Sequence, residues 1–167
     1  MVILIQVKPQ APALNASVSY YFPRAGQAPA PVLIDLIKSA KASVDMAIYS
    51  FSDQDIANVL IADKKRGITV RVISDKTEVK SKYQKTLLAT LKKSGIPVKI
   101  NTHSGLMHLK VTIVDKVTAT TGSFNYTNGA ETKNDEVFVV LKNAMIAKDF
   151  DSEFMTMWSD SGNYKNY

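Results

Sequence analysis

The hydrophobic positions of this chain follow the two-residue period of strands in some segments and the period of helices in others. Short β-branched or alternating runs predict strands, and apolar residues three and four positions apart predict amphipathic helices. The expected strands are residues 18–22, 43–51, 68–74, 97–100, 108–114, 117–121 and 136–141. The expected helices are residues 31–40, 54–66, 80–93 and 144–158. This order favours an α/β fold, an α/β/α sandwich around a mixed, largely parallel β-sheet.

Local signals define several boundaries within this pattern. Asp53 can cap the second helix, which Gly67 ends, and Gly95 ends the third. The third helix is expected to turn Tyr83, Leu87, Leu88 and Leu91 inward. Residues 108–114 and 117–121 predict a hairpin around Asp115-Lys116.

The 167 residues suffice for one domain with a substantial core, which we expect over residues 17–167. Residues 1–16 predict a flexible segment, in which an apolar run at 2–5 precedes a Pro/Ala-rich stretch at 9–16. The apolar run is too short to span a bilayer and lacks a basic leading region. It is either the remnant of a removed export signal, a disordered start or an edge strand.

Composition narrows the chemistry. The chain has no cysteine and only two histidines, which argues against a disulfide framework, a thiolate metal site or a histidine-cluster zinc site. We therefore expect neither a metal nor another cofactor. The net charge of +6 favours a polyanionic partner, with nucleic acid first and an anionic membrane surface second. In a dimer, residues 64–66 and a lysine-rich stretch at 76–99, with Glu78 as its only acidic residue, are expected to form a basic groove.

Most of the candidate site residues lie between His108 and Asn125. Residues i and i+2 of a strand face the same side, so His108 and Lys110 should point together, with Leu109 on the opposite face. An imidazole beside an ammonium suits an anion. The Gly122-Ser123 turn adds backbone N–H groups and a hydroxyl, and Asn125 adds an amide.

This string, His-x-Lys, four residues, Asp, six residues, Gly-Ser, one residue and Asn, resembles the signature of the phospholipase D superfamily. Residues 41–52, 64–67 and 131–141 are similar to the small bacterial endonuclease branch of that superfamily, and the likeness covers residues 17–158. The resemblance implies a phospholipase D-like fold. It also implies a metal-independent phosphodiesterase that hydrolyses nucleic acid with little sequence specificity.

The resemblance assigns roles to the signature. His108 would be the nucleophile that forms a phosphohistidine intermediate. Lys110, Ser123 and Asn125 would bind the non-bridging phosphate oxygens, on which charge develops in the transition state.

Other positions have supporting roles. Glu136 stands where similar enzymes place the acid that orients the histidine, and Asp135 is the neighbouring alternative. Strand alternation directs Asp115 away from the site, so Asp115, like Gly122, is expected to be structural. His103 is expected to be a surface residue of a loop.

A single imidazole cannot act as nucleophile and as leaving-group acid, because the two groups lie on opposite faces of phosphorus. Larger relatives carry two copies of the signature, whereas this chain carries one. We therefore expect a homodimer with His108 of each chain facing the other at a two-fold interface.

Three alternatives compete with a metal-independent nuclease. A lipid phosphodiesterase would use the same chemistry but needs an exposed apolar rim, which the sequence does not locate. A non-catalytic nucleic-acid-binding module is disfavoured because every catalytic position is occupied. A metal-dependent nuclease could use Glu78 and Lys80 with Asp45, but that spacing falls at a helix start and is taken as coincidence. Similarity to exported small relatives favours a periplasmic or secreted protein.

Overall fold

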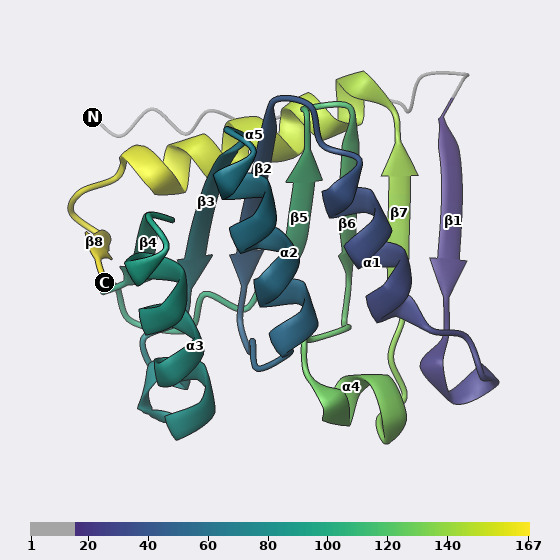
Figure 1. Cartoon of the computed structure of the whole chain (residues 1–167), viewed down its shortest axis with the longest axis horizontal. Helices are drawn as coiled ribbons and strands as arrows, with labels where there is room; N and C mark the ends of the chain where they lie inside the picture. The colour runs from purple at the N-terminus through teal and green to yellow at the C-terminus, as the bar shows by residue number, and fades with distance from the viewer. Residues whose placement is uncertain (1–15) are drawn as a thin grey trace, which may run out of the picture.

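One β-sheet runs through the part of the chain that the structure, a computed structural model, describes, residues 16–167 (Figure 1). Its eight strands lie in the order β1-β7-β6-β5-β2-β3-β4-β8. The strands are β1 (Ser17–Tyr21), β2 (Ser43–Ile48), β3 (Thr69–Ser74), β4 (Val98–Asn101), β5 (Lys110–Val114), β6 (Thr118–Gly122), β7 (Phe138–Lys142) and β8 (Tyr164–Asn166). The helices are α1 (Pro29–Lys38), α2 (Gln54–Lys65), α3 (Lys82–Lys93), α4 (Asn128–Thr132) and α5 (Ala144–Ser159), with short 3-10 turns η1 (Pro23–Ala25) and η2 (Glu78–Lys80). The predicted flexible segment, residues 1–16, lies outside the described residues except for Ala16.

The sheet is mixed, as predicted, but antiparallel pairs predominate. Only β2 with β3 and β3 with β4 are parallel, while β1–β7, β2–β5, β4–β8, β5–β6 and β6–β7 are antiparallel. Parallel neighbours need a long crossover, and only α2 and α3 supply one between neighbouring strands. The expectation of a largely parallel sheet is therefore wrong in its proportions.

Helices cover both faces of the sheet, which confirms the α/β/α sandwich. Helices α1, α2 and α3 lie on one face and α5 crosses the other (Figure 1). Leu33, Leu60 and Leu88 belong to the core cluster on the first face. Ile113 and Phe154 belong to a separate cluster beneath α5.

Chain direction brings several loops to one end of the sheet, the lower end in Figure 1. Strands β2, β3 and β6 finish at this end, while β5 and β7 start from it, as the strand registers require. Helix α2 begins here, where the Asp53 carboxylate accepts hydrogen bonds from the N–H groups of Asp55 (2.9 Å) and Ile56 (3.0 Å), confirming the predicted cap.

The predicted hairpin is confirmed, and its turn has a defined backbone form. Asp115 and Lys116 have φ values of 52° and 57°, and the Val117 N–H donates to the Val114 carbonyl (3.1 Å). Two successive positive φ values identify a type I′ turn, whose twist matches that of the strands that it joins.

The third helix is rotated from its predicted orientation. Tyr83 is 77% exposed, so its expected inward position is wrong. Gln84 is buried instead, on the same face as Leu87, Leu88 and Leu91. The short elements α4 and β8 were not predicted, because neither carries a long periodic pattern.

Candidate active site

His108 and Lys110 meet at the end of the sheet just described. His108 is exposed and lies two residues before β5, while Lys110 opens the strand and is buried. The Lys110 Nζ is 3.1 Å from both the Nδ1 and the Nε2 of His108, and 2.8 Å from its carbonyl oxygen. Leu109 and Val111 line a cavity beneath α5 on the opposite face. The predicted pairing is therefore confirmed.

Burial weakens the hydration of the Lys110 ammonium. Desolvation lowers the pKa of Lys110, while the negative charges of Glu136 and Glu78 partly oppose this shift. A bound anion would replace the water that the buried ammonium has lost, and would therefore stabilise its charged form. The two side chains thus form a pair that suits an anion.

Tyr49, which directly follows β2, completes this cluster. Its ring centroid is 4.5 Å from that of His108, with 54° between the ring planes, and 4.9 Å from the Lys110 Nζ. The Tyr49 N–H donates to the Leu109 carbonyl (2.9 Å), which holds the two segments together. No spacing along the chain links Tyr49 to His108, and only the β2–β5 register brings them into contact.

Ser123 and Glu136 face each other across β6 and β7. The Ser123 hydroxyl donates to the Glu136 carboxylate and accepts from the Val137 N–H (3.1 Å). The other Glu136 oxygen accepts from the Asn134 amide (3.1 Å). Within residues 16–167, therefore, the hydrogen bonds of Glu136 go to Ser123 and Asn134 and not to His108, so the expected direct contact is not formed.

Asp135, the alternative to Glu136, faces elsewhere. Its carboxylate lies 3.5 Å from the Arg24 Nε in a solvent-exposed ion pair. Both residues precede β7 and so lie outside any strand, but their carboxylates have different partners, and Glu136 is the one whose charge acts on Lys110.

Asn125 ties the signature to the segment that follows β2. Its side-chain oxygen accepts from the Ser50 N–H (3.2 Å). The neighbouring Tyr126 N–H donates to the Ser50 carbonyl (3.1 Å), and the Tyr126 carbonyl accepts from Ser52 (2.9 Å) and Asp53 (3.0 Å). Since the oxygen of Asn125 is already used, its NH₂ group is the end that can donate to a phosphate.

Gly122 permits the close approach of β6 and β7 beside Ser123. Its φ is +130°, and a Cβ at this position would lie 2.1 Å from the Val137 carbonyl oxygen. Only glycine fits such a site. The Ser123 N–H then reaches the same carbonyl (3.0 Å).

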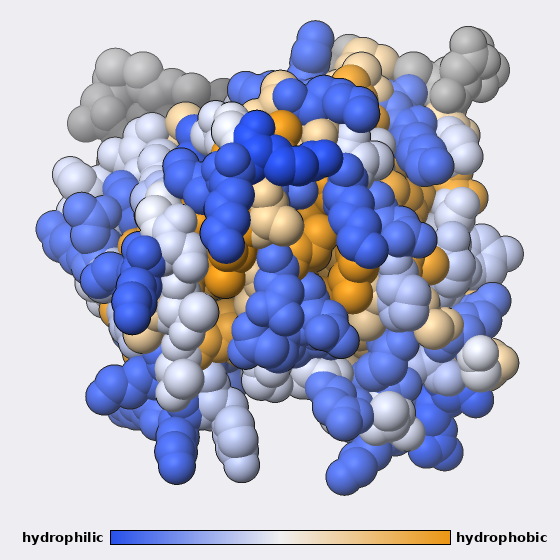
Figure 2. Space-filling model, in the orientation of Figure 1, coloured by the Kyte–Doolittle hydropathy of each residue, from blue (hydrophilic) through white to orange (hydrophobic). Residues whose placement is uncertain are grey.

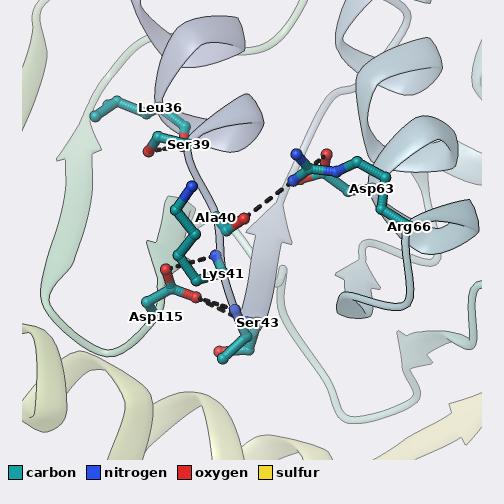
Figure 3. A network of polar contacts seen from close by, with 9 residues as sticks. Leu36, Ser39, Ala40, Lys41, Ser43, Asp63, Arg66 and Asp115 are labelled. Carbon is teal, nitrogen blue, oxygen red and sulfur yellow. Dashed lines mark hydrogen bonds and ion pairs between the residues drawn. The ribbon is translucent and has the colours of Figure 1, made fainter.

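Asp115 lies at the far end of β5 from Lys110 and does not join the site. Its carboxylate accepts from the backbone N–H groups of Lys41 (2.8 Å), Ala42 (2.7 Å) and Ser43 (2.9 Å), as Figure 3 shows. Burial alone would raise the pKa of Asp115, but these three donors outweigh it and the pKa is lowered. Asp115 thus secures the connection between α1 and β2.

His103 and three aromatic residues lie apart from the His108–Lys110 pair. His103 is partly exposed in a loop, and its ring meets the edge of Tyr164 with centroids 5.7 Å apart. Phe51 and Phe124 are fully buried core residues, whereas Tyr20 is 62% exposed.

Within a single chain, the basic residues are divided between the two ends of the sheet. Hydrophilic side chains are spread over the face made by α1, α2 and α3 (Figure 2). Because α2 and α3 both run away from the site, Lys64, Lys65, Arg66, Lys92 and Lys93 lie at the opposite end of the sheet. The Lys76 and Lys99 amines bind backbone carbonyls of His103 and Trp158. Lys80, Lys82 and Lys85 are exposed at the end where the site lies.

Two features are absent from residues 16–167. No three His, Asp or Glu side chains come together as a metal site would require. No helix in this part of the chain has both the length and the apolar character needed to cross a bilayer.

Known proteins resemble both the sequence and the fold. A family model described as "Cardiolipin synthase, PLD-like domain" matches residues 33–158. A phospholipase D from Rickettsia prowazekii is 35% identical over 118 residues, 71% of this chain and 57% of that protein. A mitochondrial cardiolipin hydrolase from Danio rerio is 31% identical over 147 residues, 86% of this chain and 64% of that protein. The chain thus spans less than two thirds of the length of these relatives.

Two solved structures match nearly whole chains. Nuc, a phospholipase D family member from Salmonella typhimurium, superposes with a TM-score of 0.83 at 35% identity, over 92% of this chain and 99% of that one. NucT from Helicobacter pylori gives a TM-score of 0.77 at 27% identity, over 86% and 96%. Together with the family model, these matches show that the chain belongs to the phospholipase D superfamily, in its single-signature bacterial branch.

Proposed function

We propose that the protein is a metal-independent phosphodiesterase that hydrolyses nucleic acid with little sequence preference. The observation that carries this proposal is the exposed His108 imidazole with the buried Lys110 ammonium 3.1 Å from both ring nitrogens. Ser123 and Asn125 add a hydroxyl and an amide from loops at the same end of the sheet. Nucleophile and oxyanion donors are thus gathered on one rigid scaffold.

The reaction has two displacements at phosphorus. A ring nitrogen of His108 forms an N–P bond while the P–O bond to the leaving group breaks, and the departing oxygen takes a proton from a second imidazole. Water then gives a proton of its own to the second imidazole and attacks phosphorus, which breaks the N–P bond and frees His108. Lys110, Ser123 and Asn125 hold the non-bridging oxygens in both steps.

The second imidazole is supplied in this proposal by another copy of the chain. His103 is a poor candidate, because it lies in the loop before His108 with its ring against Tyr164. A homodimer with the two His108 side chains facing each other provides both groups from one signature.

Nucleic acid is favoured by the net charge of +6 and by Lys80, Lys82 and Lys85, exposed at the end of the sheet that carries the site. One observation favours lipid as a second candidate. Leu106 and Leu109, two residues before and one residue after His108 in the chain, are 49% and 40% exposed, and Leu109 lines the apolar cavity beneath α5 on the face opposite His108. The names of the Rickettsia and Danio relatives agree with this alternative.

A paired assay tests the proposal. The protein in excess EDTA is incubated with supercoiled plasmid and, separately, with vesicles containing cardiolipin. We expect plasmid nicking in EDTA, intact lipid, and no nicking by His108→Ala. Loss of nicking in EDTA with recovery in magnesium would contradict the mechanism, and cleavage of lipid alone would favour the second candidate.

A further inference from the structure

A cavity of about 300 Å³ opens beside the candidate active site. Its lining residues are Phe22, Arg24, Ser123, Asp135, Glu136 and Val137. Ser123 and Glu136 belong to both places, since the Ser123 hydroxyl donates to Glu136 and the charge of Glu136 acts on Lys110. A ligand whose phosphate lies on Lys110 and Ser123 would therefore extend directly into this cavity.

Phe22 presents an aromatic face on a well-fixed loop. The side chain is 44% exposed, and the Tyr20 ring meets it edge-on with centroids 5.8 Å apart. The Phe22 N–H donates to the Gln27 side chain (2.6 Å), and the Gly26 N–H closes η1 on the Pro23 carbonyl (2.9 Å). An exposed ring held this firmly is a ready stacking surface.

Arg24 lines the same cavity, and its interactions within the chain are few and exposed to solvent. Its Nη1 donates to the Lys133 carbonyl (3.1 Å), and its Nε is 3.5 Å from Asp135, with side chains 60% and 90% exposed. An ion pair so open to water contributes little, so a ligand can displace it at small cost. The guanidinium plane can also stack on a flat ligand.

The charges of the cavity decide which ligand fits. Two carboxylates, Asp135 and Glu136, outnumber the single guanidinium of Arg24, which disfavours a second phosphate. They favour a neutral, planar group that offers N–H donors at its edge. An aromatic face combined with carboxylate acceptors suits a nucleobase.

We propose that this cavity binds the base of a nucleotide that flanks the scissile phosphate. This inference rests on the proposed function, because it takes the phosphate to lie on Lys110 and Ser123. Stacking on Phe22 tolerates every base, so the cavity adds affinity with little sequence preference.

Binding and cleavage together test the cavity. In a His108→Ala background, a fluorescent single-stranded oligonucleotide is compared with the same strand in which abasic residues replace the bases. Phe22→Ala should weaken binding of the normal strand roughly tenfold and leave the abasic strand unchanged. Phe22→Trp should restore binding. Val117→Ala, exposed at the far end of the sheet, is the matched control. In the active protein, Phe22→Ala should raise KM for the normal strand.

The outcomes separate this inference from the proposed function. The base subsite is wrong if Phe22→Ala weakens binding of the normal and abasic strands equally, or if it weakens binding of neither strand. If the protein binds the normal strand more tightly than the abasic strand but hydrolyses no nucleic acid, the base subsite is supported and the proposed nuclease activity is wrong. If Phe22→Ala instead lowers cleavage of cardiolipin vesicles, the cavity serves a lipid and the inference is wrong.

Discussion

Lys110 and Asp115 stand five residues apart in the signature and lie at opposite ends of one buried strand. Lys110 contacts His108, whereas Asp115 binds the backbone of residues 41–43. Alternation is a local property, so the sequence could predict that His108 and Lys110 point together. Asp115 is away from the site for another reason, since it lies beyond the far end of β5, in the turn, with a φ of 52°. The contacts of Tyr49 with His108 and of Glu136 with Ser123 depend on strand register, which local alternation does not reveal.

The lowered pKa of Lys110 predicts where activity ends at alkaline pH. Phosphate binding needs the ammonium, so activity should be present below the folded-state pKa of Lys110 and lost as pH rises through it. Burial places that limit below the ordinary value of 10.5. Lys110→Arg, whose guanidinium stays charged, should be slower but should lack this alkaline limb. Rates measured over an alkaline pH series provide the check.

The control for this experiment is Lys110→Ala, which should lower the rate about 100-fold or more at every pH. An alkaline limb that is unchanged in Lys110→Arg would belong to another group. Tyr49 would then be the first to examine, because its ring contacts both His108 and Lys110.

Asp115 is expected to contribute to stability and not to chemistry. Asp115→Ala leaves three backbone donors without their acceptor and should lower the free energy of unfolding by about 1–3 kcal/mol at pH 7. Because the folded-state pKa is lowered, this contribution is complete above 3.8 and is lost as pH falls through the folded-state value. Urea unfolding at neutral and acid pH should show the gap between variant and wild type closing. A rate per folded molecule that falls in Asp115→Ala would contradict this role.

At the scale of elements, α3 is the helix that positions the segment after β2. The buried Gln84 side chain accepts from the Phe51 N–H (2.7 Å) and donates to the Tyr49 carbonyl (3.0 Å) and to the Ser74 hydroxyl (2.8 Å). The apolar pattern favoured Tyr83 for the inward position. The backbone turn at residues 49–51 needs hydrogen-bond partners that an aromatic ring cannot provide, and such a need is invisible in a hydrophobic pattern.

Replacement of Gln84 should therefore disturb both folding and catalysis. Gln84→Leu leaves the Phe51 N–H without its acceptor and removes the shorter of the two hydrogen bonds to the Tyr49 carbonyl, so it should lower the free energy of unfolding by about 2–4 kcal/mol. It should also lower kcat, because Tyr49 carries the ring that packs on His108. Urea titration and steady-state rates measure the two effects.

Leu88→Ala is the matched control, since Leu88 is fully buried on the same helix and its truncation costs about 2–5 kcal/mol. We expect this variant to keep its kcat under conditions where it stays folded. An equal loss of kcat in the two variants would mean that general destabilisation, and not the position of Tyr49, explains the effect of Gln84→Leu.

At the scale of the whole molecule, the candidate site residues lie at one end of the sheet, and the stabilising contacts of Asp115 lie at the other end. The predicted elements were mostly correct because their periodic patterns are long, and the layered architecture follows from them. The proportion of parallel pairs was overestimated because β5, β6 and β7 follow one another without a crossover between sheet neighbours. A list of elements does not fix which strands become neighbours.

If two chains share one active site, activity should depend on which chains are mixed in the dimer. Wild-type chains are refolded with a ninefold excess of His108→Ala chains, so that most wild-type chains pair with an inactive partner. If both imidazoles are needed, activity per wild-type chain should fall about tenfold. The control is the same mixture without unfolding, in which the original dimers persist. Activity per wild-type chain that is unaffected by the excess would show that one chain is competent alone.

The contact beneath Gly122 has a consequence for interpreting other chains that carry this signature. A methyl group at that position would collide with the Val137 carbonyl oxygen, 2.1 Å away. A chain with alanine there must spread its two strands, which would carry the serine hydroxyl away from its carboxylate partner. The presence of glycine at this position in a sequence thus indicates that the serine hydroxyl and the carboxylate can still form their hydrogen bond. It can be checked in the sequence before any assay is run.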